Sequence, residues 1–300
     1  MSYERGKRFA ERLYKEAECL QPELRVYYYI GYCMDDENLF DYIRFSQKHN
    51  APSARFLQLN GLRLRSERET EKLIAQIGKV GIETIDLTFY GTKDYHDRFA
   101  GRNGDFDFLT CILHSAVACG LNIHASCPLH KENLDQAEDL LEMLTGYCNG
   151  DISFFLPHGK GRGYALDSLR LTLEDMDLLG ESVRCHLGRC QTEKEWIAGF
   201  CGNEPQSRVL TLVLRPDNID LLEQMSLAEI IKYLESLDDQ YYAAIPSTVE
   251  LMELYGNKDG TRLYRRFRDL HLEWQRKFLS ESGRRIWDMN DETHHFSVRV

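Results

Sequence analysis

The sequence has no long uninterrupted run of apolar residues. None approaches the roughly 18 residues that a membrane-spanning helix requires. Its N-terminal segment also lacks a basic stretch leading into an apolar core of signal-peptide length. We therefore expect a cytoplasmic protein with no membrane partner.

A surplus of positive charge is absent as well. The 37 lysines and arginines are outnumbered by 48 aspartates and glutamates, which gives a formal net charge of -11. Proteins that bind nucleic acids irrespective of sequence neutralise phosphates with an excess of Lys and Arg. We expect no nucleic-acid partner, and we interpret the acidity as an aid to solubility.

The cysteines do not form the framework of a disulfide-rich protein. There are nine, an odd number, and they are spread through apolar segments. We expect most of them to be buried thiols that behave as small apolar side chains. Cys185, Cys190 and Cys201 are the candidate metal ligands, because thiolates can hold zinc or an iron–sulfur cluster, but ordinary thiols are the favoured interpretation.

The chain contains enough apolar residues, 43%, to bury a large core. Its 28% of charged residues is typical of a folded globular protein. Its first 160 residues alternate helix-period segments with short β-rich runs, which is typical of parallel βαβ units. The expected strands are 25–30, 54–59, 84–88, 122–127 and 151–156. The expected helices are 3–19, 37–48, 67–79, 106–119 and 133–145.

Parallel strands with crossover helices form an open sheet or a barrel, and both bind ligands at the carboxyl ends of the strands. The pattern changes after residue 163. We expect helices at 172–188, 226–237 and 261–281, a strand at 209–214 and a loose tail at 288–300. The predicted domains are therefore 1–165 and a mostly helical C-terminal extension, 166–300, packed on the first.

Five motifs follow one another at the predicted strand ends. They are Leu57-Gln-Leu-Asn60-Gly61, Ile85-Asp-Leu-Thr88, Asp94-Tyr-His96-Asp97-Arg-Phe-Ala-Gly101, Ile123-His-Ala-Ser126 and Phe154-Phe-Leu-Pro157-His-Gly-Lys-Gly161-Arg162-Gly163. In this order and spacing they resemble the radical S-adenosylmethionine (radical SAM) enzymes over about residues 25–165. The resemblance implies an α/β fold: a partial (β/α) barrel of parallel strands with a mixed α/β C-terminal extension.

The features that define the chemistry of that family are missing. Radical SAM enzymes hold a [4Fe-4S] cluster on three cysteines spaced Cys-x3-Cys-x2-Cys, and no cysteines here have that spacing. The first strand and its loop have no counterpart, and the Gly-Gly-Glu motif that meets SAM corresponds to Gly31-Tyr32-Cys33. We expect no cofactor on the isolated chain; SAM and the cluster are implied by the resemblance alone.

The resemblance also selects candidate ligand-binding residues at the strand ends. They are Gly31, Asn60, Thr88, Ser126, Gly161 and Arg162. Asn60 and Thr88 could hydrogen-bond a ribose or another polar ligand, and the glycine-rich loop around Arg162 could turn backbone amides toward an anion. For Asp94, His96 and Asp97 we expect a structural role rather than acid–base catalysis, and we identify no catalytic residue.

Several functions stay open at this point. The chain is either a degenerate binding or accessory protein for a small molecule, peptide or protein partner, or part of a split or truncated radical SAM enzyme whose cluster segment lies elsewhere. In the second case it would act on a peptide or small molecule. A third possibility is a remodelled enzyme using Cys185, Cys190 and Cys201. We expect the strand edge beginning at Arg25 to be covered by another part of the chain or by a second molecule, in a homo-oligomer or heteromer.

Overall fold

The computed structural model describes residues 2–20, 35–50, 55–158, 161–200, 212 and 214–283. The chain separates into two compact units. The sheet unit comprises Tyr27–Leu156 and Glu174–Gly188, and the helical unit comprises Met1–Val26, Pro157–Leu173 and Arg189–Val300. This division differs from the predicted boundary after residue 165, because the N-terminal helix groups with the C-terminal part and 174–188 groups with the sheet.

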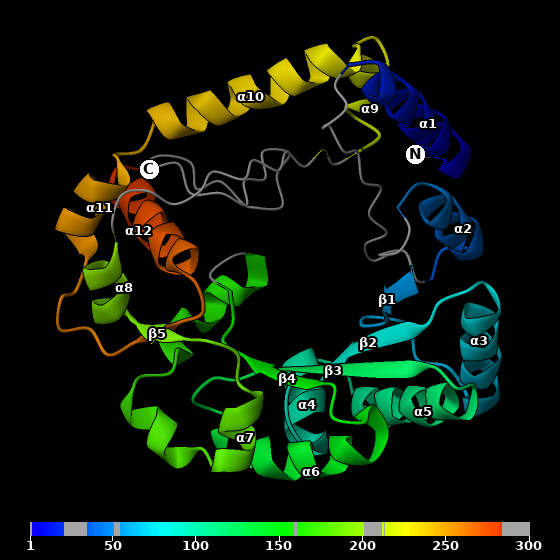
Figure 1. Cartoon of the computed structure of the whole chain (residues 1–300), viewed down its shortest axis with the longest axis horizontal. Coiled ribbons are helices and arrows are strands. Elements are labelled where there is room, and N and C mark those ends of the chain that lie inside the picture. The colour runs from blue at the N-terminus through cyan, green and yellow to red at the C-terminus, as the bar shows by residue number, and fades with distance from the viewer. Residues whose placement is uncertain are drawn as a thin grey trace. The chain divides into compact units, whose positions relative to one another are not determined.

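The sheet unit contains a four-stranded parallel sheet in the order β1-β2-β3-β4 (Figure 1). Its strands are β1 (Phe56–Gln58), β2 (Thr84–Thr88), β3 (Asn122–Pro128) and β4 (Ile152–Phe155). Its helices are α2 (Leu39–Asn50), α3 (Glu67–Lys79), α4 (Lys93–Ala100), α5 (Asp105–Ala118), α6 (Ala137–Cys148) and α7 (Glu181–His186), with the short turns η2 (Leu134–Gln136) and η4 (Glu174–Leu178).

Four of the five predicted strands are therefore confirmed, and they pair in parallel as expected. The fifth, predicted at 25–30, lies outside the described residues, as does the strand edge at Arg25. Among the residues that the structure describes, the sheet is not closed into a barrel. The coarse prediction of a mixed α/β fold is confirmed, whereas the partial barrel stays a prediction.

Local sequence signals explain where the helices begin and end. At the start of α3 a capping box joins Ser66 and Glu69: the Ser66 backbone N–H donates to the Glu69 carboxylate at 3.0 Å, and the Ser66 side chain accepts from the Glu69 backbone. Helix α4 ends at Gly101, whose φ of 66° is left-handed and favours glycine. The single helix predicted at 172–188 is wrong: η4 and α7 are separate because Gly180 has extended backbone angles, φ -63° and ψ 157°.

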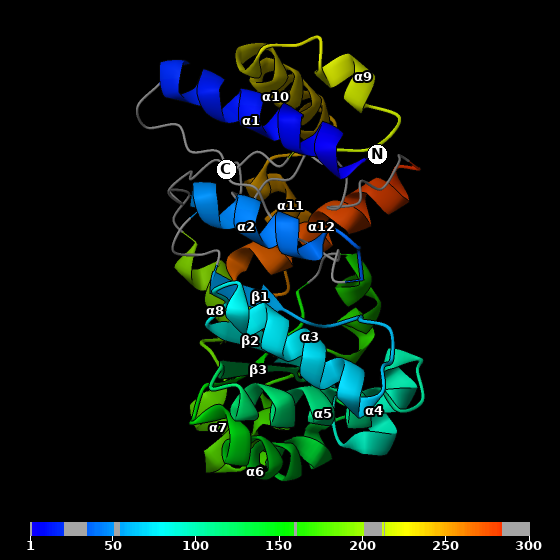
Figure 2. The same cartoon turned by 90° about the vertical axis from the view of Figure 1, so that its right-hand side faces the viewer.

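The helical unit is built around two apolar clusters. The elements are α1 (Tyr3–Leu20), η3 (Gly161–Leu169), β5 (Gln191–Thr192), α8 (Glu193–Gly199), α9 (Ile219–Leu222), α10 (Leu227–Ala243), α11 (Thr248–Tyr255), β6 (Leu263–Tyr264) and α12 (Phe267–Glu281). Helix α1 packs along α10 (Figure 2) through Phe9, Leu13 and Ala17. The second cluster joins α11, β6 and α12.

Three predictions for this half need correction or lie outside the described residues. The helix predicted at 261–281 begins later, because Leu263 and Tyr264 pair in an antiparallel arrangement with Thr192 and Gln191. Most of the predicted strand at 209–214 and the whole tail at 288–300 fall outside the described residues. None of the helices in the described ranges is both long enough and apolar enough to cross a membrane.

Candidate functional site

The side chains of the four parallel strands alternate between two different faces of the sheet. One face packs against α5 and α6, which lie on the same side of the sheet in Figure 1. This face is apolar and buried, through Leu57, Leu59, Ile85, Leu87, Ile123, Ala125, Cys127, Ile152 and Phe154. The opposite face, called the polar face below, carries Gln58, Asn60, Asp86, Thr88, His124, Ser126, Asp151 and Ser153 in its two central rows. The flanking rows of the same face include Phe56, Pro128 and Phe155.

The register of the strands arranges the polar face in two rows. One row runs through Gln58, Asp86, His124 and Asp151, and the other through Asn60, Thr88, Ser126 and Ser153. Parallel sheets that are covered on both faces usually carry apolar residues on both, and barrels commonly fill their interior with branched apolar side chains. Two consecutive polar rows therefore indicate a surface for water or a polar ligand rather than a packed core.

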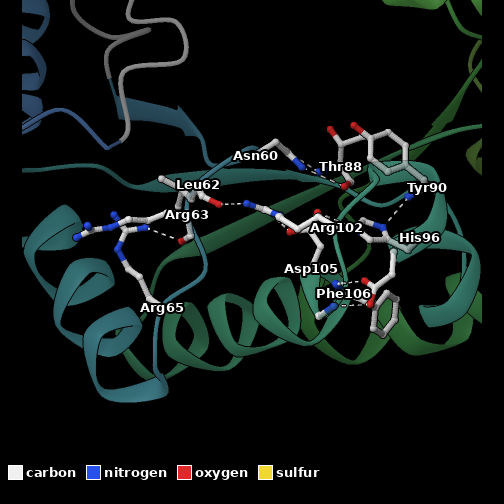
Figure 3. A network of polar contacts seen from close by, with 12 residues as sticks. Asn60, Leu62, Arg63, Arg65, Thr88, Tyr90, His96, Arg102, Asp105 and Phe106 are labelled. Atoms are coloured by element: carbon white, nitrogen blue, oxygen red, sulfur yellow. Dashed lines mark hydrogen bonds and ion pairs between the residues drawn. The ribbon is translucent and has the colours of Figure 1, made fainter.

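Three of the candidate residues meet at the carboxyl end of this face. The Asn60 amide donates to the Thr88 carbonyl at 3.1 Å and accepts from the Thr88 N–H at 2.8 Å (Figure 3). The side chain thus continues the β1–β2 pairing beyond the last residue of β1. The Thr88 hydroxyl lies 3.0 Å from the Ser126 hydroxyl. Asn60 holds the strand ends together, and the hydroxyls of Thr88 and Ser126 are the better candidates for contact with a ligand.

A buried network behind this edge holds the loops that follow the strands (Figure 3). Arg102 donates to the Leu62 carbonyl after β1 and to the Asp105 carboxylate at the start of α5. His96, which is fully buried, lies with Nε2 3.3 Å from Asp105 and accepts from the Tyr90 N–H at 3.1 Å through Nδ1. One carboxylate therefore connects the loops after β1 and β2.

Asp97 also stabilises the backbone near the start of α5. Its carboxylate accepts from the backbone N–H groups of Gly104 and Phe106 at 2.6 and 2.8 Å, which supports the start of α5. Both His96 and Asp97 are thus committed to the scaffold, in agreement with the structural role that the sequence predicted for this stretch.

Sequence reasoning missed a second group on the polar face. The Asp86 carboxylate lies 2.6 Å from His124 Nδ1, and His124 Nε2 lies 3.3 Å from the Ser153 hydroxyl. The hydrogen bond with Asp86 raises the pKa of His124, while partial burial opposes the rise. The available signal was the alternation in Ile85-Asp86-Leu87-Thr88 and Ile123-His124-Ala125-Ser126, which places polar side chains at every second position.

The remaining candidates are Gly31, Gly161 and Arg162. Gly31 lies outside the described residues, and Gly161 and Arg162 begin η3 in the helical unit. The structure does explain the next glycine of the loop: a Cβ on Gly163 would meet the His158 carbonyl oxygen at 2.2 Å. The His158 ring in turn lies 3.3 Å from the buried Asp269 carboxylate. Gly163 and His158 are therefore closely packed within the helical unit.

We expect Gly163→Ala to destabilise the helical unit by about 1–3 kcal/mol, because the backbone must move to admit the methyl group. Gly199→Ala is the matched control in the same unit, since a Cβ there meets nothing within 4 Å. Urea unfolding followed by circular dichroism measures both variants. Equal stabilities for the two would show that the loop accommodates a side chain and that the close approach is unimportant.

The residues that the structure describes do not fit an iron–sulfur cluster. Within the described ranges, no three His, Cys, Asp or Glu side chains are placed to hold a metal ion. Cys185 is exposed in the sheet unit, Cys190 belongs to the helical unit, and Cys201 lies outside the described residues. Burial raises the pKa of Cys148 to about 12, and that of the Cys127 thiol rises for the same reason, so neither favours the thiolate that ligates a metal.

A groove of about 790 Å³ lies between α3 and α5, two helices of the sheet unit. Polar side chains in its lining already have partners: Asp107 pairs with Lys93 at 2.6 Å, and His114 lies 3.3 Å from the Tyr147 hydroxyl. Side chains of the polar face have partners as well, but its hydroxyl and imidazole groups come from adjacent strands and lie next to one another. We therefore take the polar face, not the groove, as the candidate site.

No protein-family model matches the sequence, and no curated protein matches it significantly.

Proposed function

We propose that this chain is a binding protein whose polar face receives a small hydrophilic molecule. One observation carries the proposal: every side chain in two consecutive rows across the sheet is polar, from Gln58 and Asn60 on β1 and its extension to Asp151 and Ser153 at β4. Unsatisfied polar groups are costly in a packed core, so a face of this composition requires water or a hydrophilic ligand.

The side chains of the face restrict the charge of the ligand. Its two carboxylates, Asp86 and Asp151, accompany one histidine, and none of the eight residues is a lysine or arginine. The other five groups are hydroxyls and amides, which can donate and accept hydrogen bonds. A neutral, hydroxylated molecule matches this set better than an anion does, because a phosphate or carboxylate would be repelled by both aspartates.

The resemblance to radical SAM enzymes supports the same location. Proteins of that kind bind ligands inside a barrel at the carboxyl ends of the strands. Thr88 is the last residue of β2, and Ser126 is its register partner on β3. Because the cysteine spacing of the cluster is absent from the sequence, we propose a degenerate binding or accessory role. No step of radical chemistry is assigned to this chain.

Binding can be tested with adenosine, glucose and inorganic phosphate as separate probes. We expect adenosine or glucose, each rich in hydroxyl groups, to raise the melting temperature at millimolar concentration and phosphate to leave it unchanged. At 100 times the dissociation constant, a bound probe stabilises the folded state by about 2.7 kcal/mol. Calorimetry with the full chain then gives the affinity.

Thr88→Val should remove most of this stabilisation, because the hydroxyl is lost with little change in shape. Thr84→Val is the matched control, since Thr84 is on the same strand and face, but four residues toward its amino end. Stabilisation by phosphate alone, or equal stabilisation of both variants by the neutral probes, would contradict the proposed site.

A further inference from the structure

Three side chains of the polar face form a continuous chain of hydrogen-bonding groups across three neighbouring strands. The order is the Asp86 carboxylate on β2, the His124 imidazole on β3 and the Ser153 hydroxyl on β4, with separations of 2.6 and 3.3 Å. In serine hydrolases the imidazole accepts the proton of the hydroxyl, while the carboxylate orients the imidazole and stabilises its charge. The same three groups stand here in the same order.

We propose that Ser153 is a nucleophile activated by His124 and positioned by Asp86, and that the polar face hydrolyses small esters of hydroxylated alcohols. The choice of alcohol rests on the proposed function. The activation of Ser153 rests only on the hydrogen-bonding chain.

The sheet gives the three groups a rigid and accessible setting. Main-chain pairing fixes the positions of β2, β3 and β4 relative to one another, as a preorganised site requires. The Asp86 residue is 8% exposed, so its short bond to His124 is largely shielded from water. The His124 side chain is 26% exposed and Ser153 is half-buried, which leaves the hydroxyl within reach of a small molecule.

Neighbouring groups supply the remaining requirements. Ser126 is the register partner of Ser153 on β3, and its hydroxyl lies 3.0 Å from that of Thr88. Either hydroxyl can turn from its present acceptor, Ser126 from the Leu87 carbonyl and Thr88 from Ser126, to donate to the oxygen that becomes negatively charged when Ser153 attacks a carbonyl group. Side-chain donors can fill this role even where the backbone N–H groups are engaged in the sheet.

The reaction balances without a further reactant except water. Ser153 Oγ forms a bond to the ester carbonyl carbon as its proton passes to His124 Nε2. The bond from that carbon to the alkoxy oxygen breaks, and the alcohol leaves with the proton from His124. Water, deprotonated by His124, then attacks the acyl group on Ser153, releasing a carboxylic acid and restoring the hydroxyl.

The pH dependence of this reaction follows from the charges around His124. Asp86 faces the imidazole at 2.6 Å and Asp151 at 3.9 Å, and the nearby Phe56 ring, 6.2 Å away, does not titrate. The hydrogen bond to Asp86 is the main cause of the raised His124 pKa. Because His124 must be neutral at Nε2 to accept the proton, the rate should rise with pH and reach half its maximum above the ordinary value of 6.5.

A fluorophosphonate probe tests the nucleophile directly, because it loses fluoride and stays attached to an activated serine. We expect one adduct per chain, which peptide mass spectrometry locates on Ser153, and none on Ser153→Ala. Ser182→Ala is the control, since Ser182 is an exposed serine in the same unit. His124→Gln should slow labelling by at least about 100-fold, as expected for the loss of a general base.

The variant Asp86→Asn tests whether Asp86 positions His124 or only supports the structure of the sheet. It should slow labelling and also move the midpoint of the pH profile downward, because the group that raises the His124 pKa is gone. Circular dichroism confirms that each variant is folded. An adduct on another serine, no adduct on the folded wild-type chain, or an unchanged pH midpoint in Asp86→Asn would overturn the proposal.

The labelling test of Ser153 and the binding test of the polar face can fail independently of each other. Binding of adenosine or glucose without labelling of Ser153 leaves the binding function standing and removes the hydrolytic one. Labelling of Ser153 without binding of any neutral probe has the opposite meaning: the serine is activated, and the class of ligand is wrong. Hydrolysis of 4-nitrophenyl acetate, lost in Ser153→Ala, provides the turnover measurement.

Discussion

Asp105→Ala is expected to destabilise the sheet unit by about 3 kcal/mol, because it removes the carboxylate that faces buried His96 Nε2 and part of the Arg102 guanidinium. The Asp105 residue is 7% exposed and accepts from Arg102, with His96 3.3 Å away and fully buried. Arg102 can regain water, since 28% of its side chain is exposed, but His96 cannot. Urea unfolding measures the loss.

Asp107→Ala is the matched control on the same helix. Asp107 pairs with Lys93 at 2.6 Å, and both side chains are more than half exposed, at 62% and 54%. Exposed ion pairs contribute about 0–1 kcal/mol, so the control should change stability little. Similar losses for the two variants would mean that the network around Asp105 does not hold the loops after β1 and β2.

The effect of Asp105→Ala should also depend on pH. Burial by itself would raise the pKa of Asp105, but the hydrogen bonds with His96 and Arg102 outweigh it and lower the pKa. A carboxylate with a lowered pKa stabilises the folded state above its unfolded pKa of about 3.9 and loses this contribution as the pH falls. The difference in the free energy of unfolding between wild type and Asp105→Ala should therefore become smaller below about pH 4.

Trp274→Ala is expected to produce the largest loss in the helical unit, about 3–5 kcal/mol, as for other fully buried aromatic side chains. Trp274 is 0% exposed and packs in a cluster with Leu251, Tyr264, Phe267 and Leu270. The Phe267 ring lies 5.8 Å away in an edge-to-face arrangement. Truncation leaves a cavity that the surrounding helices can close only in part.

Trp274→Phe serves as the conservative variant. Within the part of the chain that the structure describes, Trp274 Nε1 has no hydrogen-bond partner, so phenylalanine loses volume but no hydrogen bond. Trp274→Phe should therefore lower the free energy of unfolding much less than Trp274→Ala does. A phenylalanine variant as unstable as the alanine variant would show that the indole N–H matters, for example through a buried water.

The two destabilising variants lie in different compact units, which allows each loss to be located. Hydrogen exchange should show faster exchange in α5 and its neighbours for Asp105→Ala, and in α11 and α12 for Trp274→Ala. If both variants accelerate exchange throughout the chain, the two units unfold as one cooperative body.

The structure also changes how the strand-end motifs are understood. Asn60 was expected to contact a ligand, but its amide is already engaged with the backbone of Thr88. Gly163 was expected to serve an anion-binding loop, but its lack of a side chain is required by the nearby His158 carbonyl. Both positions have structural reasons to carry these residues, independent of any ligand.

The sequence by itself determined the local elements of the sheet unit. The predicted ranges 67–79 and 84–88 coincide with α3 and β2, because a capping box and an apolar period of 3.6 specify the helix, and β-favouring residues specify the strand. The alternation of polar residues in three strands was equally visible. These features depend on interactions between residues that are near one another along the chain.

Only the tertiary structure decided which of those residues meet. Asp86, His124 and Ser153 are 38 and 29 residues apart along the chain, and the strand register alone brings them into one hydrogen-bonding chain. A shift of one residue in the pairing would turn a strand's polar side chains to the other face, so alternation predicts a polar face but not its partners. Likewise, the grouping of α1 with the C-terminal helices follows from packing between Phe9 and the side chains of α9 and α10, which no local pattern specifies.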